Sequence, residues 1–190
     1  MNLIPFRNIE EAKESAKLLC RAFAFYEINL PEEPSNIGLQ QTQELMAQSF
    51  RCVGWKDLTR RVELQGSVTY LDDRGDCRSA HVNLAERLQG IIGVHIPLET
   101  LRAAFGIAAV GCTAQARSEA RRFFSNCPAA TAAQWGKLMQ VAAAFSYHTR
   151  YNNHRTEFDV RMLEYSRQVA TAEILGTPVP KKPRRRKSVS

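Results

Sequence analysis

Apolar residues recur at intervals of three and four along most of the chain, the spacing that places them on one face of an α-helix. Residues 39–62 show this most plainly: Leu45, Met46 and Phe50 share one side of a first helix, and Trp55 begins a second. The same spacing predicts eight helices, at residues 9–26, 39–50, 55–62, 79–92, 97–105, 113–124, 131–151 and 156–175.

Polar residues at the predicted helix ends support these assignments. Asn8 is placed to cap the first helix, and Thr131 with Gln134 forms a capping-box pattern ahead of the seventh. Gly54 separates the second and third helices, and its freedom to adopt a left-handed conformation suits the end of the second.

Residues 66–71 are the one convincing strand-like run, because Val68 and Tyr70 alternate with polar residues. Residues 62–64 and 94–96 are both candidate pairing partners, and the pattern does not choose between them. The sequence therefore predicts a mainly α fold, a compact multi-helix domain with one minor β-hairpin or strand.

We expect this globular domain to span residues 1–176, with an N-terminal helical module at 8–62 and the remaining helices, at 63–176, packed on it. The segment 177–190 contains three prolines and six cations, with Val179 and Val189 as its large apolar residues. This composition predicts a disordered basic tail.

The composition is that of an ordinary globular protein, with 44% hydrophobic and 24% charged residues. No apolar run approaches the roughly 20 residues of a membrane span, and the N-terminus lacks the pattern of a signal peptide. The five scattered cysteines are expected to be reduced thiols, which favours a cytoplasmic location. They are Cys20, Cys52, Cys77, Cys112 and Cys127.

The net charge of +7 is concentrated at the C-terminus, where six cations leave only +1 for all the preceding residues. Flexible cations of this kind bind phosphates without sequence preference, so the tail predicts contact with duplex or single-stranded DNA. A nuclear-import signal and a solvated end without a specific role remain alternatives. The six residues are Lys181, Lys182, Arg184, Arg185, Arg186 and Lys187.

Three further arginines share one side of the helix at 113–124 and form a second candidate nucleic-acid contact: Arg117, Arg121 and Arg122. Because Glu119 lies among them, a solvated helix face is the competing interpretation. Residues 79–106 resemble a helix-turn-helix in spacing, but their long apolar connector favours core packing. Residues 147–155 interleave aromatic residues and cations, which suits either single-stranded nucleic acid or an ordinary helix end.

Catalytic and metal-binding patterns are weak. Cys77 and His81 stand four residues apart and would share a helix face, but the sequence shows no third orienting group. His148, His154 and Asp159 lack the close spacing of metal ligands. We therefore predict no enzyme activity, no cofactor and no metal.

Residues near the N-terminus match a known pattern: an alanine- and lysine-rich helix, a Gln-x-x-Glu-Leu-x-Ala segment, and Gly-x-x-Trp-x-x-Leu. The pattern resembles a short helical module of bacterial mobile-element proteins that is often labelled glyoxalase-related. Ile37-Gly38 stands where the module has Ser-His, and the glycine adjoins the tryptophan. The matching residues are Ala12-Lys13, Ala16-Lys17-Leu18, the run Gln41 to Ala47, and Trp55-Lys56-Asp57-Leu58.

The resemblance covers about 50 of the 190 residues and implies a plasmid, phage or genomic-island setting, but no glyoxalase chemistry. Two functions follow as hypotheses. The first is a non-enzymatic accessory protein that contacts nucleic acid through its tail, in plasmid maintenance, transfer (conjugation) or regulation. The second is a protein-interaction or inhibitor module whose helical body binds a protein partner. The patterns do not distinguish a monomer from a dimer.

Overall fold

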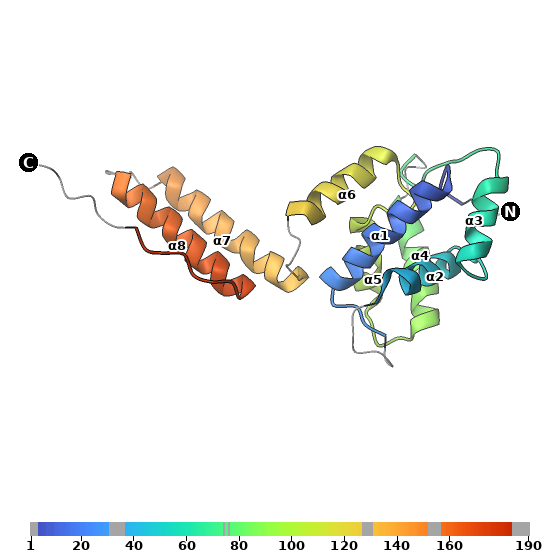
Figure 1. The fold of residues 1–190 in the computed structure, drawn as a ribbon, viewed down its shortest axis with the longest axis horizontal. Helices are drawn as coiled ribbons and strands as arrows, with labels where there is room; N and C mark the ends of the chain where they lie inside the picture. The colour runs from blue at the N-terminus through green and yellow to red at the C-terminus, as the bar shows by residue number, and fades with distance from the viewer. Residues whose placement is uncertain are drawn as a thin grey trace, which may run out of the picture. The chain divides into compact units, whose positions relative to one another are not determined.

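The computed structural model is built almost entirely of helices (Figure 1). It describes residues 4–30, 37–73, 75, 77–126, 131–151 and 157–183, and the side chains of residues 145–151 and 157–158 are not described. Its helices are α1 (Ile9–Phe25), α2 (Leu39–Ser49), α3 (Trp55–Leu64), α4 (Cys77–Ile92), α5 (Leu98–Ile107), α6 (Ala114–Asn126), α7 (Ala132–Tyr151) and α8 (Glu157–Leu175).

The contacts divide the chain into two compact units, residues 1–128 and 129–190. The first contains α1 to α6, and the second contains α7 and α8. The single domain over 1–176 that we expected from the sequence stays a prediction, and each unit is described by itself.

In the first unit, α1 lies at the centre and packs against α2, α3, α5 and α6, while α4 packs against α5 and α2 (Figure 1). The buried side of α1 is the one that its periodicity predicts, with Ala12, Ala16, Leu19 and Phe23 almost completely buried. The predicted cap is also confirmed, because the Asn8 side chain accepts a hydrogen bond from the Glu11 amide at 2.9 Å.

The turn between α2 and α3 differs from the expectation. Arg51, not Gly54, adopts the left-handed conformation, with φ of 61°, and Gly54 is extended. A Cβ added at Gly54 would lie 2.5 Å from Glu44 Oε2. That carboxylate accepts a hydrogen bond from the Trp55 amide at 2.9 Å. A side chain at position 54 would therefore displace the Glu44 carboxylate from the start of α3.

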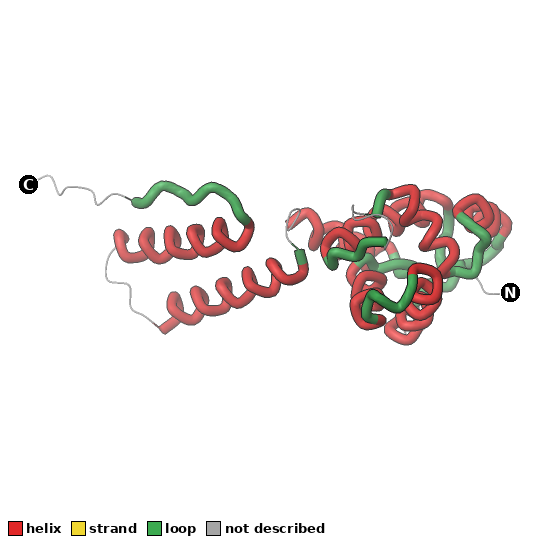
Figure 2. Tube along the Cα trace, turned by 90° about the horizontal axis from the view of Figure 1, so that it is seen from below, coloured by secondary structure: helices red, strands yellow, loops and turns green. Residues whose placement is uncertain are grey.

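The predicted β-hairpin is wrong. Helix α3 continues through Leu64 and buries Val62, so residues 62–64 are helical, and no strand is drawn among the described residues (Figure 2). Residues 66–70 form an irregular segment, and the Leu71 amide next donates to the Gly111 carbonyl at 3.0 Å. Of the alternating apolar residues, Tyr70 contacts α1, where its hydroxyl donates to the Glu11 carboxylate at 3.0 Å.

In the second unit, α7 and α8 lie side by side (Figures 1 and 2). The Thr131–Gln134 capping box is confirmed, with the two reciprocal hydrogen bonds at 2.8 and 3.3 Å. Gln134 also donates to the carbonyl of Ile174 at 3.2 Å. This bond joins the start of α7 to the end of α8, so the two helices run antiparallel.

Candidate functional site

The arginine that was expected on an open face of α6 is buried. Arg117 is 2% exposed and forms ion pairs with Glu11 at 2.9 Å and Glu14 at 3.0 Å. It also donates to the carbonyl of Cys112. This guanidinium ties α6 to α1, so it is not presented to a phosphate backbone.

The other predicted cationic residues lie in different settings. Arg121 is 57% exposed and pairs with Glu14 at 2.9 Å, and Arg122 is exposed. Lys181 and Lys182 are exposed beyond the end of α8, and residues 184–187, with the remaining four tail cations, lie outside the described residues. The structure thus brings Arg117 and Arg121 together on one carboxylate, Glu14.

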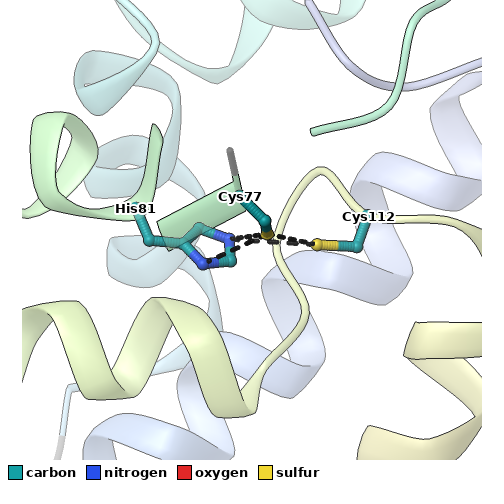
Figure 3. A group of neighbouring side chains, drawn as sticks. All are labelled: Cys77, His81 and Cys112. Carbon is teal, nitrogen blue, oxygen red and sulfur yellow. Dashed lines mark hydrogen bonds between the residues drawn. The ribbon is translucent and has the colours of Figure 1, made fainter. Parts of the chain in front are cut away.

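A second group of side chains meets where α4 faces the loop between α5 and α6. Cys77 and His81 lie one turn apart on α4, and Cys112 approaches them from the loop (Figure 3). The two sulfur atoms are 3.4 Å apart, and Cys77 Sγ lies 3.6 Å from His81 Nδ1. The pairing of Cys77 and His81 was expected from their spacing, whereas the third member was not.

Two features hold the Cys112 loop in place. Gly111 has φ of 75°, and a Cβ there would lie 2.6 Å from Pro5 Cγ and 3.0 Å from Leu71 Cδ1. On the other side of Cys112, the Asp72 carboxylate accepts from the Thr113 amide at 3.0 Å and from its hydroxyl at 2.6 Å. The loop is therefore fixed both by close packing and by the hydrogen bonds of Asp72 to Thr113, the residue before α6.

His81 is held by its other ring nitrogen. His81 Nε2 lies 3.0 Å from the carbonyl oxygen of Val110, and the side chain is 4% exposed. Because a carbonyl oxygen can only accept a hydrogen bond, Nε2 carries the ring proton. Nδ1 is unprotonated, and its lone pair does not point at Val110. Burial lowers the pKa of His81 despite the opposing effect of the Val110 carbonyl, so the imidazole is neutral at pH 7.

The thiol of Cys112 is strongly biased toward its protonated form. It is 3% exposed. Burial raises the pKa of Cys112 far above its ordinary range, and the Cys77 thiol beside it acts in the same direction. A nucleophilic thiolate needs the opposite shift, so the arrangement does not have the electrostatics of a cysteine nucleophile.

The three side chains line a pocket of about 570 Å³. Asp72, Arg102 and Glu119 line the same pocket, so charged groups of both signs surround the sulfur and nitrogen atoms. At Gly106, an added Cβ would meet only His81 Nδ1, at 3.9 Å. The glycine leaves space on the Nδ1 side of the ring.

Sequence reasoning missed Cys112 because it lies 35 residues from Cys77 and no motif connects the two. The only local signal is the adjacent Gly111, which indicates a tight turn but says nothing of what the next side chain meets. Among the described residues, the group of Cys77, His81 and Cys112 is the one whose donor atoms converge closely enough for a metal ion.

None of the helices in the described part of the chain is long and apolar enough to cross a membrane. Comparisons of the chain with protein-family models, curated proteins and solved structures give no match.

Proposed function

We propose that the protein is a non-enzymatic accessory protein that contacts nucleic acid, chiefly through the basic segment 181–187. The observation that carries this proposal is the location of the positive charge. Residues 181–187 contain six cations, whereas the whole preceding chain has a net charge of only +1. Neutralising phosphates releases counterions from the nucleic acid, which favours binding without sequence preference.

The arrangement of charges in the first unit supports nucleic-acid contact through the tail rather than through the helical body. Arg117 and Arg121, which were candidates for a second contact, are both paired with Glu14. Their charges are offset within the protein, so the body presents less positive charge than its arginine count indicates. The third candidate on α6, Arg122, is exposed.

The setting that we propose is a plasmid, phage or other mobile element, in maintenance, transfer or regulation. This rests on the resemblance of residues 12–58 to the mobile-element module. The structure is compatible with such a module, because residues 9–64 form three helices that pack on one another.

The test is binding of labelled duplex and single-stranded DNA over a series of salt concentrations, for the full chain and for a chain that ends at Gly176. Six phosphate contacts give a slope of about −5 in a log–log plot for duplex, from about −0.9 per contact. Changing Arg184, Arg185 and Arg186 to Gln reduces the slope by about 0.9 for each residue.

The matched control is the double change of Arg121 and Arg122 to Gln, which removes two exposed cations from α6 and leaves the tail intact. We expect this variant to retain the affinity and slope of the full chain. Equal binding by the full chain and the chain ending at Gly176 would overturn the proposal.

A second candidate function is protein interaction through α7 and α8. Among the described side chains of these two helices, Ala172 alone is buried, and Met139 and Val160 are 53% and 51% exposed. Helices of about 20 residues with so little buried surface gain most of their stability from a partner. The occupant that we propose is a second copy of this chain.

Charge complementarity favours self-association. Helix α7 contains Lys137 and Arg150 and no acidic residue, whereas α8 contains four acidic residues and two arginines. Two helix pairs related by a two-fold axis can place α7 of one copy beside α8 of the other, as in a four-helix bundle.

The test is the solution mass of the full chain measured by light scattering. We expect a dimer, and we expect Met139→Glu with Val160→Glu to convert it to a monomer. The control is Val53→Glu in the first unit, where the side chain is 88% exposed. A monomeric wild-type protein, or equal effects of the two sets of changes, would exclude this function.

A further inference from the structure

The strongest unexplained feature is the convergence of two thiols and one imidazole on a single point. The donor atoms of Cys77, His81 and Cys112 all lie within 4.8 Å of one another. They come from α4 and from the loop before α6, and their placement does not depend on the basic tail. The cluster therefore calls for an explanation separate from nucleic-acid binding.

Two of the distances are close to the edges of a zinc coordination tetrahedron. Zn–S bonds of about 2.3 Å and Zn–N bonds of about 2.0–2.1 Å, at tetrahedral angles, place two sulfurs about 3.8 Å apart and a sulfur and a nitrogen about 3.6 Å apart. The observed Cys77 Sγ to Cys112 Sγ distance is 3.4 Å, and Cys77 Sγ lies 3.6 Å from His81 Nδ1. Cys112 Sγ lies 3.9 Å from His81 Nε2, so binding one ion through Nδ1 requires the Cys112 thiol or the imidazole ring to move when the metal enters.

The hydrogen bond to Val110 prepares His81 as a ligand. Metal-binding histidines usually donate from their other ring nitrogen to a carbonyl or carboxylate, which fixes both tautomer and orientation. His81 Nε2 makes this bond to the Val110 carbonyl at 3.0 Å, which leaves Nδ1 as the nitrogen with a lone pair for a metal, 3.6 Å from Cys77 Sγ. The imidazole is therefore already in the tautomer whose Nδ1 can bind a metal. Cys112 Sγ lies nearer the other nitrogen, 3.9 Å from Nε2.

We propose that Cys77, His81 and Cys112 bind a zinc ion through two thiolates and His81 Nδ1. The fourth position is held by a water molecule on the side of the pocket that Asp72, Arg102 and Glu119 also line. Two thiols each lose a proton to solvent when Zn²⁺ binds, so the metal and its protein ligands have no net charge. A neutral complex is compatible with the burial of His81 and Cys112.

The donor set also defines which ions compete. Thiolate and imidazole ligands suit Zn²⁺ and other soft or borderline ions, while Mg²⁺ and Ca²⁺ prefer oxygen. The proposal concerns binding of the metal and assigns no reaction to the site. It stands independently of the nucleic-acid proposal, because a chain that ends at Gly176 keeps all three ligands.

The first experiment uses the full chain, purified in reducing buffer, with added Zn²⁺ or Co²⁺. We expect one equivalent of zinc by elemental analysis, release of about two protons at a pH where both thiols start protonated, and a thiolate-to-cobalt charge-transfer band with Co²⁺. The ligands are then located by alkylation and mass spectrometry. Zinc should slow modification of Cys77 and Cys112 and leave Cys20 unchanged.

Variants provide the second experiment. Loss of the hydrogen-bond partner of a metal ligand weakens metal binding roughly 10- to 100-fold. Cys112→Ser and His81→Asn remove a ligand itself, so each should weaken zinc binding by more than this. The control is Cys52→Ser, because Cys52 is also a buried free thiol but lies outside the group. We expect it to keep the wild-type affinity.

The alkylation measurement needs no variant, so the proposal can be tested even if Cys112→Ser does not fold. Substoichiometric zinc with no protection of Cys77 and Cys112 would overturn it. So would equal loss of zinc in Cys52→Ser and Cys112→Ser, or a Cys77–Cys112 disulfide that persists in reducing buffer with zinc present.

Discussion

Arg117 and Glu14 form an ion pair across 103 positions of the sequence, with Arg117 Nε donating to Glu14 Oε2 at 3.0 Å. The guanidinium is 2% exposed and also pairs with Glu11. The pair joins the last helix of the first unit to α1, the helix that contacts most of the others. Arg117 therefore has a structural role that can be separated from any contact with nucleic acid.

Replacing Arg117 by Gln should strongly destabilise the first unit. The change leaves Glu11 and Glu14 partly buried without their cation, and breaking a buried pair from one side costs about 3 kcal/mol or more. The measurement is urea denaturation followed by circular dichroism, with the free energy of unfolding compared between variant and wild type.

The control for this change is Arg122→Gln on the same helix. Arg122 is exposed, and an exposed substitution of this kind changes the free energy of unfolding by less than about 0.5 kcal/mol. If the two variants unfold at the same urea concentration, Arg117 does not make the contribution that its burial indicates.

The stability of the protein should fall in acid partly through Glu11. Burial acts to raise the pKa of Glu11, but the Arg7 amide, the charge of Arg117 and the Tyr70 hydroxyl outweigh it and hold the pKa below its ordinary value. A carboxyl whose folded pKa is depressed stabilises the fold above its unfolded pKa, about 4.3. This contribution disappears as the pH falls through the lower folded value.

We expect Glu11→Gln to flatten the acid side of a plot of unfolding free energy against pH, measured between pH 7 and pH 3. The variant is less stable at pH 7, and the difference from wild type shrinks in acid. The comparison is Glu63→Gln, an exposed position on α3, which should leave the curve unchanged. A difference for Glu11→Gln that is constant with pH would contradict this assignment.

Helix positions could be predicted from the sequence because a helix is a local structure. The apolar spacing of α1 and the caps at Asn8 and Thr131 involve residues a few positions apart, and the structure confirms them. The strand prediction failed for the converse reason. Val68 and Tyr70 alternate with polar residues, but a strand also needs a partner. Of the two candidates, residues 62–64 are part of α3 and residues 94–96 form a turn.

The candidate site could be predicted only in part. Cys77 and His81 are neighbours along one helix, so their spacing indicates their contact. The contact of Cys112 with α4 and the burial of Arg117 against α1 both depend on the path of the loop between α5 and α6. That path involves contacts between Gly111, Pro5 and Leu71 that no periodic pattern encodes.

Removing the Asp72 carboxylate should destabilise the loop that leads into α6. Asp72 accepts hydrogen bonds from both the amide and the hydroxyl of Thr113, and the loss of hydrogen bonds to a charged group costs about 1.5–3 kcal/mol. We therefore expect Asp72→Ala to lower the thermal midpoint measured by calorimetry. Asp73→Ala, which changes an exposed neighbour, serves as the control, and an equal shift in the two variants would exclude a stabilising role for the Asp72–Thr113 hydrogen bonds.

Gly111 should tolerate a side chain less well than Gly75, although both residues have similar positive φ values of 75° and 71°. Alanine at either position incurs the left-handed strain of about 1–2 kcal/mol. An added Cβ at Gly111 also meets Pro5 and Leu71, whereas nothing lies within 4 Å at Gly75. We expect Gly111→Ala to lose about 1–3 kcal/mol more than Gly75→Ala in urea denaturation. Gly111→Ala should also weaken zinc binding, because Cys112 is the next residue. Equal losses of unfolding free energy in the two variants would show that the loop accommodates the added methyl group without displacing the site.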